Sequence, residues 1–379
     1  MSRKWDGQIS LAIYTASVMY SKNETESSVE NTIKKIHILI DCYEYLKDSL
    51  NVHIVFSWNR NATCPVIYLG ENLNWLPIHQ LLNPSDQIPK KSCEDEIKTL
   101  EAFEFKTFSL MYPVNTMRNV ARKAYFHKYS FVYDVVIVFQ FQDGEFILFA
   151  DMEQEYSSNA EAILRYLAHK WNIKDEKLGI AIRRFEYDDS ISAPVTMDEL
   201  RNAIAKKLVY QFHIFFWPQG HKIAKLKEWL NETHKFDDVI SNDDVEEDEY
   251  TEESKPWRLS DTYTVDIKRL GTTYWEPMIV IHKSAHWHNE ELPYGLDNHV
   301  ALALHLCSAG YLFPVAPNVF SMHPGIRTTK ERRKLAYKGV FHGNKALRRF
   351  YERMALEYPV NSRKCLKNRL PKHLRKNHK

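Results

Sequence analysis

The sequence predicts an α/β sandwich with a mixed, mainly parallel sheet, and three observations support this fold class. Strand, helix and strand patterns alternate at the start of the chain, over residues 9–14, 28–49 and 52–56, which is typical of layered α/β folds. Of the 379 residues, 44% are hydrophobic and 26% are charged, so the chain can bury a sizeable core. The net charge is only +2, which provides no overall field to attract nucleic acid.

The first half of the chain contains one clearly periodic helix and one hairpin. Apolar residues recur at helical spacing over 28–49, so they form one face of an amphipathic helix. Apolar runs at 131–141 and 145–150 are separated by Asp143-Gly144, a pair that is typical of a β-hairpin turn. We therefore expect two antiparallel strands at this point in the sheet.

In the second half, Thr196 and Glu199 form a capping box that predicts a helix over 196–207. The apolar strand at 278–281 is expected to end before His282, because a histidine interrupts the run. The remaining elements follow from the same patterns: strands at 103–110, 178–182, 209–217 and 311–315, and helices at 115–125, 159–171, 298–308 and 330–358.

A single domain is predicted over residues 1–360, together with two charged segments. The stretch 237–254 is strongly acidic and cannot bury apolar area, so we expect a mobile loop. Residues 361–379 are predicted to form a basic C-terminal tail.

The five cysteines form no CxxC pair, which argues against a zinc knuckle. Their odd number leaves open free thiols, or one or two disulfides with a cysteine left over. N-glycosylation triplets begin at Asn23, Asn61 and Asn231 and slightly favour a lumenal location. No apolar run reaches the ~18–20 residues that cross a bilayer, and no signal peptide precedes Trp5. Taken alone, these features predict a cytoplasmic protein.

An acidic pair, Asp151 and Glu153, directly follows the apolar run at 146–150. Carboxylates two residues apart at the end of a buried strand can point to one place beyond the sheet edge. Hard divalent cations such as Mn²⁺ and Mg²⁺ prefer oxygen ligands and often share their coordination with substrate phosphates. The pair is therefore a candidate metal–diphosphate site.

Four segments occur in a fixed order around this pair. They are residues 5–14 (Trp-Asp-Gly-Gln-Ile-Ser-Leu-Ala-Ile-Tyr), 112–122 (Tyr-Pro-Val-Asn-Thr-Met-Arg-Asn-Val-Ala-Arg), 148–153 (Leu-Phe-Ala-Asp-Met-Glu) and 317–325 (Pro-Asn-Val-Phe-Ser-Met-His-Pro-Gly). Together they resemble glycosyltransferase family 49, which contains the β-1,4-glucuronyltransferase of dystroglycan glycosylation. The resemblance covers nearly the whole chain, to about residue 360.

The resemblance implies a GT-A-like, Rossmann-type fold and a metal site. By position, Asp151 matches the first Asp of the family's Asp-x-Asp motif, Glu153 takes the place of the second, and His323 matches a late histidine ligand. The implied cofactor is Mn²⁺ or Mg²⁺, and the implied reaction is inverting transfer from a UDP-sugar, with UDP-glucuronate as the favoured donor.

The same resemblance suggests further site residues. Arg118, Asn119 and Arg122 would face the phosphates or the donor sugar, since the two arginines lie one helical turn apart. The general base is left open between Asp297 and Glu186. For Asp297, the start of a predicted helix makes an N-cap role an equal alternative.

The family also implies partners and a location. The acceptor would be a glycan or a glycoprotein, the location the Golgi lumen, and a homodimer or heterodimer is left open. Family members carry a membrane anchor, a strand and a helix ahead of the segment that begins here at Trp5. The alternative function is a catalytically silent GT-A-like protein that binds a glycan or a partner enzyme.

Overall fold

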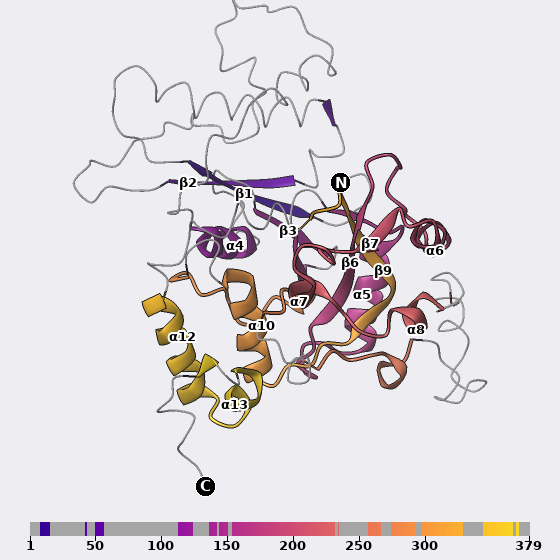
Figure 1. Ribbon diagram of the computed structural model, residues 1–379. Coiled ribbons are helices and arrows are strands. Elements are labelled where there is room, and N and C mark those ends of the chain that lie inside the picture. Colours follow the sequence, from indigo (N-terminus) through magenta and orange to yellow (C-terminus); the bar gives the residue numbers. More distant parts are fainter. Residues whose placement is uncertain are drawn as a thin grey trace, which may run out of the picture.

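The computed structural model describes residues 8–15, 42–43, 50–56, 113–123, 136–141, 144–150, 154–231, 234, 257–266, 274–292, 297–328, 344–366 and 369–370. These residues form one sheet with helices on both of its faces (Figure 1).

The strands of the sheet follow the order β2-β1-β3-β4-β8-β6-β9-β5, and β7 pairs with β6. Their bounds are β1 Ile9–Thr15, β2 Leu50–Phe56, β3 Val136–Gln140, β4 Phe146–Ala150, β5 Glu155–Tyr156, β6 Ile180–Tyr187, β7 Val209–Gln211, β8 Met278–His282 and β9 Val315–Pro324. The predicted mixed α/β fold is confirmed. Among the described pairs only β1–β2 and β6–β9 are parallel, so antiparallel pairs outnumber parallel ones.

The hairpin between β3 and β4 accounts for part of this antiparallel character. Phe139 pairs with Leu148 in the antiparallel register. Gly144 adopts a positive φ of 66°, a conformation that glycine reaches without a Cβ clash, and its N–H donates to the carbonyl of Phe141 at 2.8 Å. The hairpin predicted from the Asp-Gly pair is confirmed.

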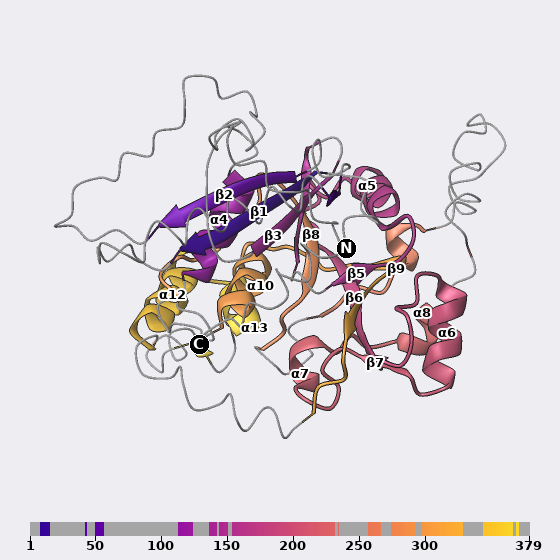
Figure 2. The same ribbon diagram turned by 90° about the horizontal axis from the view of Figure 1, so that it is seen from above.

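Helices cover the two faces of the sheet (Figure 2), and each face has its own apolar core. α4 (Val114–Lys123) and α10 (Asn298–Ser308) pack on one face, through residues such as Met117 and Leu306. α5 (Ala160–Lys170) packs on the opposite face, where Leu164 and Leu167 contact the sheet. The bounds of the smaller helices are α7 Pro218–His221, α8 Leu226–Leu230 and the short 3₁₀ helix Leu259–Asp261.

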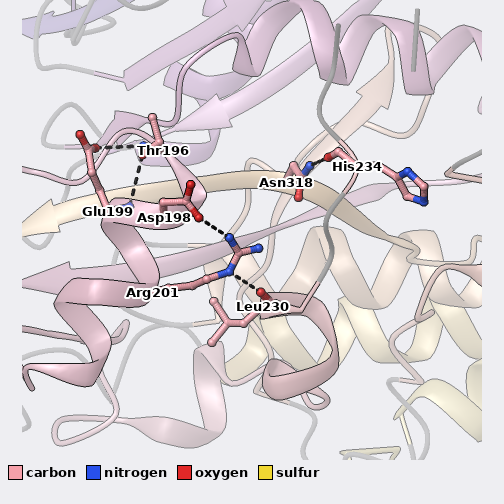
Figure 3. A network of polar contacts seen from close by, with 7 residues as sticks. All are labelled: Thr196, Asp198, Glu199, Arg201, Leu230, His234 and Asn318. Atoms are coloured by element: carbon pink, nitrogen blue, oxygen red, sulfur yellow. Dashed lines mark hydrogen bonds and ion pairs between the residues drawn. The ribbon is translucent and has the colours of Figure 1, made fainter. Parts of the chain in front are cut away.

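Helix α6 (Met197–Ala205) begins at the predicted capping box (Figure 3). The Glu199 N–H donates to Thr196 Oγ1 at 3.3 Å, and the Thr196 N–H donates to Glu199 Oε2 at 3.1 Å. Arg201 then ties α6 to the end of α8, because its Nε donates to the Leu230 carbonyl at 2.6 Å. The local sequence thus sets both the start of the helix and its attachment.

Three predicted strands have different bounds in the structure. β6 continues past residue 182 to Tyr187, and β8 includes His282, which is buried and pairs with Phe146. Polar side chains therefore continue both strands, because backbone pairing, rather than side-chain polarity, sets their length. The strand predicted at 209–217 ends at Gln211.

The last predicted strand is displaced along the chain. Residues 311–314 make only isolated bridges, whereas β9 runs from Val315 through the whole histidine-containing segment to Pro324. β9 lies between β6 and β5, and these two partners satisfy the backbone of a segment that is too polar to predict as a strand.

The C-terminal region packs onto α10. α12 (Asn344–Glu357) lies within the helix predicted at 330–358, and α13 (Asn361–Leu366) forms where the sequence predicted a tail. A disulfide joins Cys307 on α10 to Cys365 on α13, with Cα atoms 6.0 Å apart. Cys42 is disulfide-bonded as well. Among the described helices, none is long and apolar enough to cross a membrane.

Several predictions fall outside the described residues. They are the strand at 103–110, the acidic loop at 237–254, nearly all of the helix at 28–49 and the first part of the helix at 330–358.

Candidate functional site

One face of the sheet changes from apolar to polar along its length. On β6, Ile180 and Ile182 pack beneath α5 in an apolar core. Side chains two residues apart share a face of a strand, so Arg184 and Glu186 continue the same face beyond this core. Polar side chains on a buried face need hydrogen-bonding partners. Such a face is typical of a ligand site.

The neighbouring strands continue the polar surface. On β9, Ser321 pairs with Arg184, and His323 pairs with Glu186. On β5, Tyr156 pairs with Ser321, so the antiparallel register places Gln154 beside His323. We call these five residues the polar strip: Gln154, Arg184, Glu186, Ser321 and His323.

The polar strip is almost entirely enclosed. Gln154, Glu186 and Ser321 are each 0% exposed, and His323 is 6% exposed. Such a concentration of buried polar side chains is costly unless hydrogen bonds compensate it. The strip is therefore the strongest candidate for a functional site in the described residues.

Aromatic and histidine rings border the strip. The Phe212 ring lies 5.4 Å from the His323 ring and 4.9 Å from the His221 ring, measured between centroids. The Arg184 guanidinium lies 4.0 Å above the centroid of Phe212. His213 stacks on Phe212 at 3.7 Å. The Phe212 ring makes this border apolar, whereas the Arg184 guanidinium adds a positive charge and the histidine rings add polar nitrogen atoms.

The border is fixed by a turn and a short helix. Residues after β7 turn at His213, which has a positive φ of 56°, and Trp217 N–H donates to the His213 carbonyl at 2.7 Å. α7 then presents His221, whose Nε2 lies 3.8 Å from the carboxylate of Glu276. The Glu276 N–H donates to the Gly220 carbonyl at 2.7 Å, so the segment before β8 is attached to α7.

Two of the three predicted metal ligands, Asp151 and Glu153, lie outside the described residues. The described residues on either side of them are Ala150, at the end of β4, and Gln154 in the polar strip. His323 is described and lies in the strip. Among the described residues alone, no group of three His, Cys, Asp or Glu side chains is placed to hold a metal ion.

The predicted donor-binding residues lie on α4, on the face of the sheet opposite α5. Asn119 donates to the His288 carbonyl and accepts from the His288 N–H, at 2.8 and 3.0 Å. Arg118 donates to Asn115 Oδ1 at 2.9 Å and also contacts His299. These contacts join α4 to the segment after β8 and to α10.

Arg122 makes the most extensive of these contacts. Its guanidinium donates to the carbonyls of Lys283 and His286, both at 2.7 Å, and to that of Ala285. Burial lowers its pKa to about 10, so it stays protonated at neutral pH. The structure thus shows Arg122 holding the segment after β8. Donor binding by Arg118, Asn119 and Arg122 stays a prediction.

The two candidate bases have different surroundings. Glu186 lies in the polar strip beside His323. Asp297 occupies the N-cap position of α10 but makes no side-chain cap hydrogen bond. Its carboxylate instead pairs with Arg369 and accepts from the Tyr351 hydroxyl at 3.2 Å. Burial, together with the charge of Asp297, raises the pKa of Tyr351, which keeps this hydroxyl available as a donor.

Sequence reasoning missed several residues at this site. Arg184, His213 and Gln154 are absent from the predicted site, because the predicted strand at 178–182 ends before the first arginine and residue 213 lies within the predicted strand at 209–217. Alternation of apolar and polar residues through Glu186 could have extended β6. Nothing local could have identified Gln154, because its position depends on pairing with β9.

Comparison with known families gives a match over most of the chain. The sequence model of the family described as "Glycosyl-transferase for dystroglycan" matches residues 1–359. No individual curated protein matches the chain.

Proposed function

Because the chain belongs to the family of glycosyltransferases for dystroglycan, we propose that it transfers a sugar from a UDP-sugar to a glycan or glycoprotein acceptor in a metal-dependent, inverting reaction. UDP-glucuronate is the favoured donor. The observation that carries the proposal is the buried polar strip, in which Glu186 pairs with His323 and Gln154 immediately follows the acidic pair.

In this proposal Asp151, Glu153 and His323 hold Mn²⁺ or Mg²⁺. The two carboxylates provide the oxygen ligands that these hard cations prefer, and His323 would add one imidazole nitrogen. When bound, the metal would neutralise the charge that develops on the leaving diphosphate. The described part of the site fits this role, because β5 and β9 bring Gln154, next in sequence to Glu153, beside His323.

Glu186 is the base that the geometry favours. Inversion requires a group that removes the proton from the acceptor hydroxyl, and Glu186 is a buried carboxylate in the strip. The carboxylate of Asp297 is instead held by an ion pair with Arg369 and by the Tyr351 hydroxyl, so its oxygens are already engaged in contacts within the fold.

Two matched variants separate these candidates. Glu186→Gln is expected to lower kcat of transfer by about 10²–10⁴-fold, since it removes the proton acceptor. Asp297→Asn is expected to keep transfer and lower the unfolding temperature, because Arg369 loses its charged partner. Steady-state rates and thermal unfolding of both variants provide the measurement. Retained transfer in Glu186→Gln with loss in Asp297→Asn would reverse the assignment.

An oxidising, lumenal location such as the Golgi forms part of the proposal. It is supported by the disulfide between Cys307 and Cys365 and by the disulfide of Cys42, because such bonds persist in oxidising compartments. The acceptor and any dimer partner stay predictions.

The test is hydrolysis of a panel of UDP-sugars with and without Mn²⁺, by the intact protein and by Asp151→Ala. We expect Mn²⁺-dependent release of UDP from at least one sugar nucleotide, and its loss in Asp151→Ala. Calorimetry with UDP provides a second readout. Absence of both hydrolysis and Mn²⁺-dependent UDP binding would favour the catalytically silent alternative.

A further inference from the structure

Gln154 is the least satisfied residue of the polar strip. Its side chain is 0% exposed, and neither Oε1 nor Nε2 has a hydrogen-bond partner within the described part of the chain. Native proteins rarely bury a whole side-chain amide without partners, because its lost hydration is then uncompensated. A buried group of this kind calls for a partner that binds from outside the chain.

Ser321 provides a second, independent observation. It is also 0% exposed, and its Oγ has no partner among the described residues. Ser321 on β9 pairs with Tyr156 on β5. Tyr156 lies two residues after Gln154, so the side chains of Ser321 and Gln154 lie on the same face of the sheet. Two neighbouring strands thus direct unsatisfied polar atoms to one region beside His323.

The chemistry of these atoms selects the ligand. The amide supplies one acceptor, Oε1, and two donor hydrogens on Nε2, and the serine hydroxyl can donate or accept. A phosphate group only accepts, so it would leave Oε1 unsatisfied. A metal ion could bind Oε1 but not the Nε2 hydrogens. Adjacent sugar hydroxyls both donate and accept, and so they match the whole set.

We propose that Gln154 and Ser321 bind the hydroxyl groups of the donor sugar, and thus help to determine which sugar is transferred. This inference rests on the proposed function, which supplies the sugar nucleotide. In the proposed function Asp151 and Glu153 hold the metal and the diphosphate, and Gln154 directly follows them in the sequence, so the attached pyranose would lie within reach of the strip.

The main experiment replaces Gln154 with methionine, which has a similar size and no amide. Without ligand, Gln154→Met is expected to raise the unfolding temperature by about 2 °C or more, since it removes an uncompensated buried amide. With the sugar nucleotide that the protein hydrolyses, kcat/KM is expected to fall by about tenfold or more. The affinity for UDP alone should stay unchanged.

Two further variants complete the experiment. Gln211→Met makes the same substitution on β7, on the opposite face of the sheet, and should leave kcat/KM and UDP affinity unchanged. Ser321→Ala removes the neighbouring hydroxyl with a minimal change of shape, and it should lower kcat/KM without weakening UDP binding.

Each alternative result has a defined meaning. An unfolding temperature that falls or stays constant in Gln154→Met shows that the amide is already satisfied, and it overturns the proposal. Wild-type kcat/KM in this variant also overturns it. Loss of UDP affinity in step with activity would assign Gln154 to the nucleotide instead of the sugar. If the wild type hydrolyses no UDP-sugar, the proposed function itself fails, and this inference fails with it.

Discussion

Replacing His323 with alanine is expected to lower Mn²⁺-dependent transfer by about a hundredfold or more. In the proposed site His323 is the only ligand that does not come from the acidic pair, and its imidazole is held on β9 beside Glu186. Loss of one ligand weakens metal binding. The bound metal would supply several kcal/mol of charge stabilisation in the transition state, and each 1.36 kcal/mol that is lost lowers the rate about tenfold. Raising the Mn²⁺ concentration should restore part of the activity, because Asp151 and Glu153 remain.

His282→Ala is the matched control for this variant. His282 is 5% exposed, compared with 6% for His323, and it also lies on a central strand, β8. Its replacement should lower stability and leave the Mn²⁺ dependence of transfer unchanged. The measurement is initial rate against Mn²⁺ concentration for both variants. Equal Mn²⁺ dependence in His323→Ala and the wild type would show that His323 is not a metal ligand.

Removing the disulfide between Cys307 and Cys365 is expected to lower the free energy of unfolding by about 4 kcal/mol. The bond closes a loop between two residues that are 58 positions apart in the sequence. Without the bond the unfolded chain gains conformational freedom, and this stabilises the unfolded state by about the stated amount. Loss of the bond should also weaken the ion pair of Arg369 with Asp297, because Arg369 follows α13 closely in sequence. The double variant Cys307→Ser with Cys365→Ser, compared with the wild type without reductant, provides the measurement.

Ser308→Ala is the control for this experiment. Ser308 is the buried neighbour of Cys307 on α10, and its Oγ donates to the Leu304 carbonyl at 2.8 Å. Its replacement removes one hydrogen bond and should cost only about 1 kcal/mol. If the double cysteine variant loses no more than this, the bond does not stabilise the fold as the structure implies.

Local patterns predicted those parts of the fold that depend on near neighbours. The helix at 298–308 has the predicted bounds, and the capping box begins α6 at Thr196. The Asp-Gly pair also marked the hairpin. Each of these features is stabilised by contacts within a few residues, so the sequence alone contains the necessary information.

The polar ends of β6 and β9 show where such patterns fail. The predicted strand at 178–182 ends before residues 183–187, three of which carry charged side chains. In the structure, Arg183 turns to one face and donates to the carbonyl of Ile223 at 2.9 Å. Glu186 turns to the other face, where it lies beside His323. Both side chains are buried because tertiary partners satisfy or enclose them.

The same limit applies to α4. Helical spacing correctly placed Arg118 and Arg122 one turn apart, but spacing cannot say what a helix face contacts. Packing directs Arg122 to the carbonyls of the segment after β8, an interaction between residues more than 150 positions apart in the chain.

Residue identity and order are therefore enough to predict the family, the α/β class, and the acidic pair and late histidine as candidate metal ligands. The three-dimensional structure was needed to show that Glu186, His323, Gln154 and Ser321 share one buried face, that Asp297 is held by Arg369, and that Cys307 joins Cys365. These relations depend on strand register and helix packing, which bring together residues that no local pattern connects.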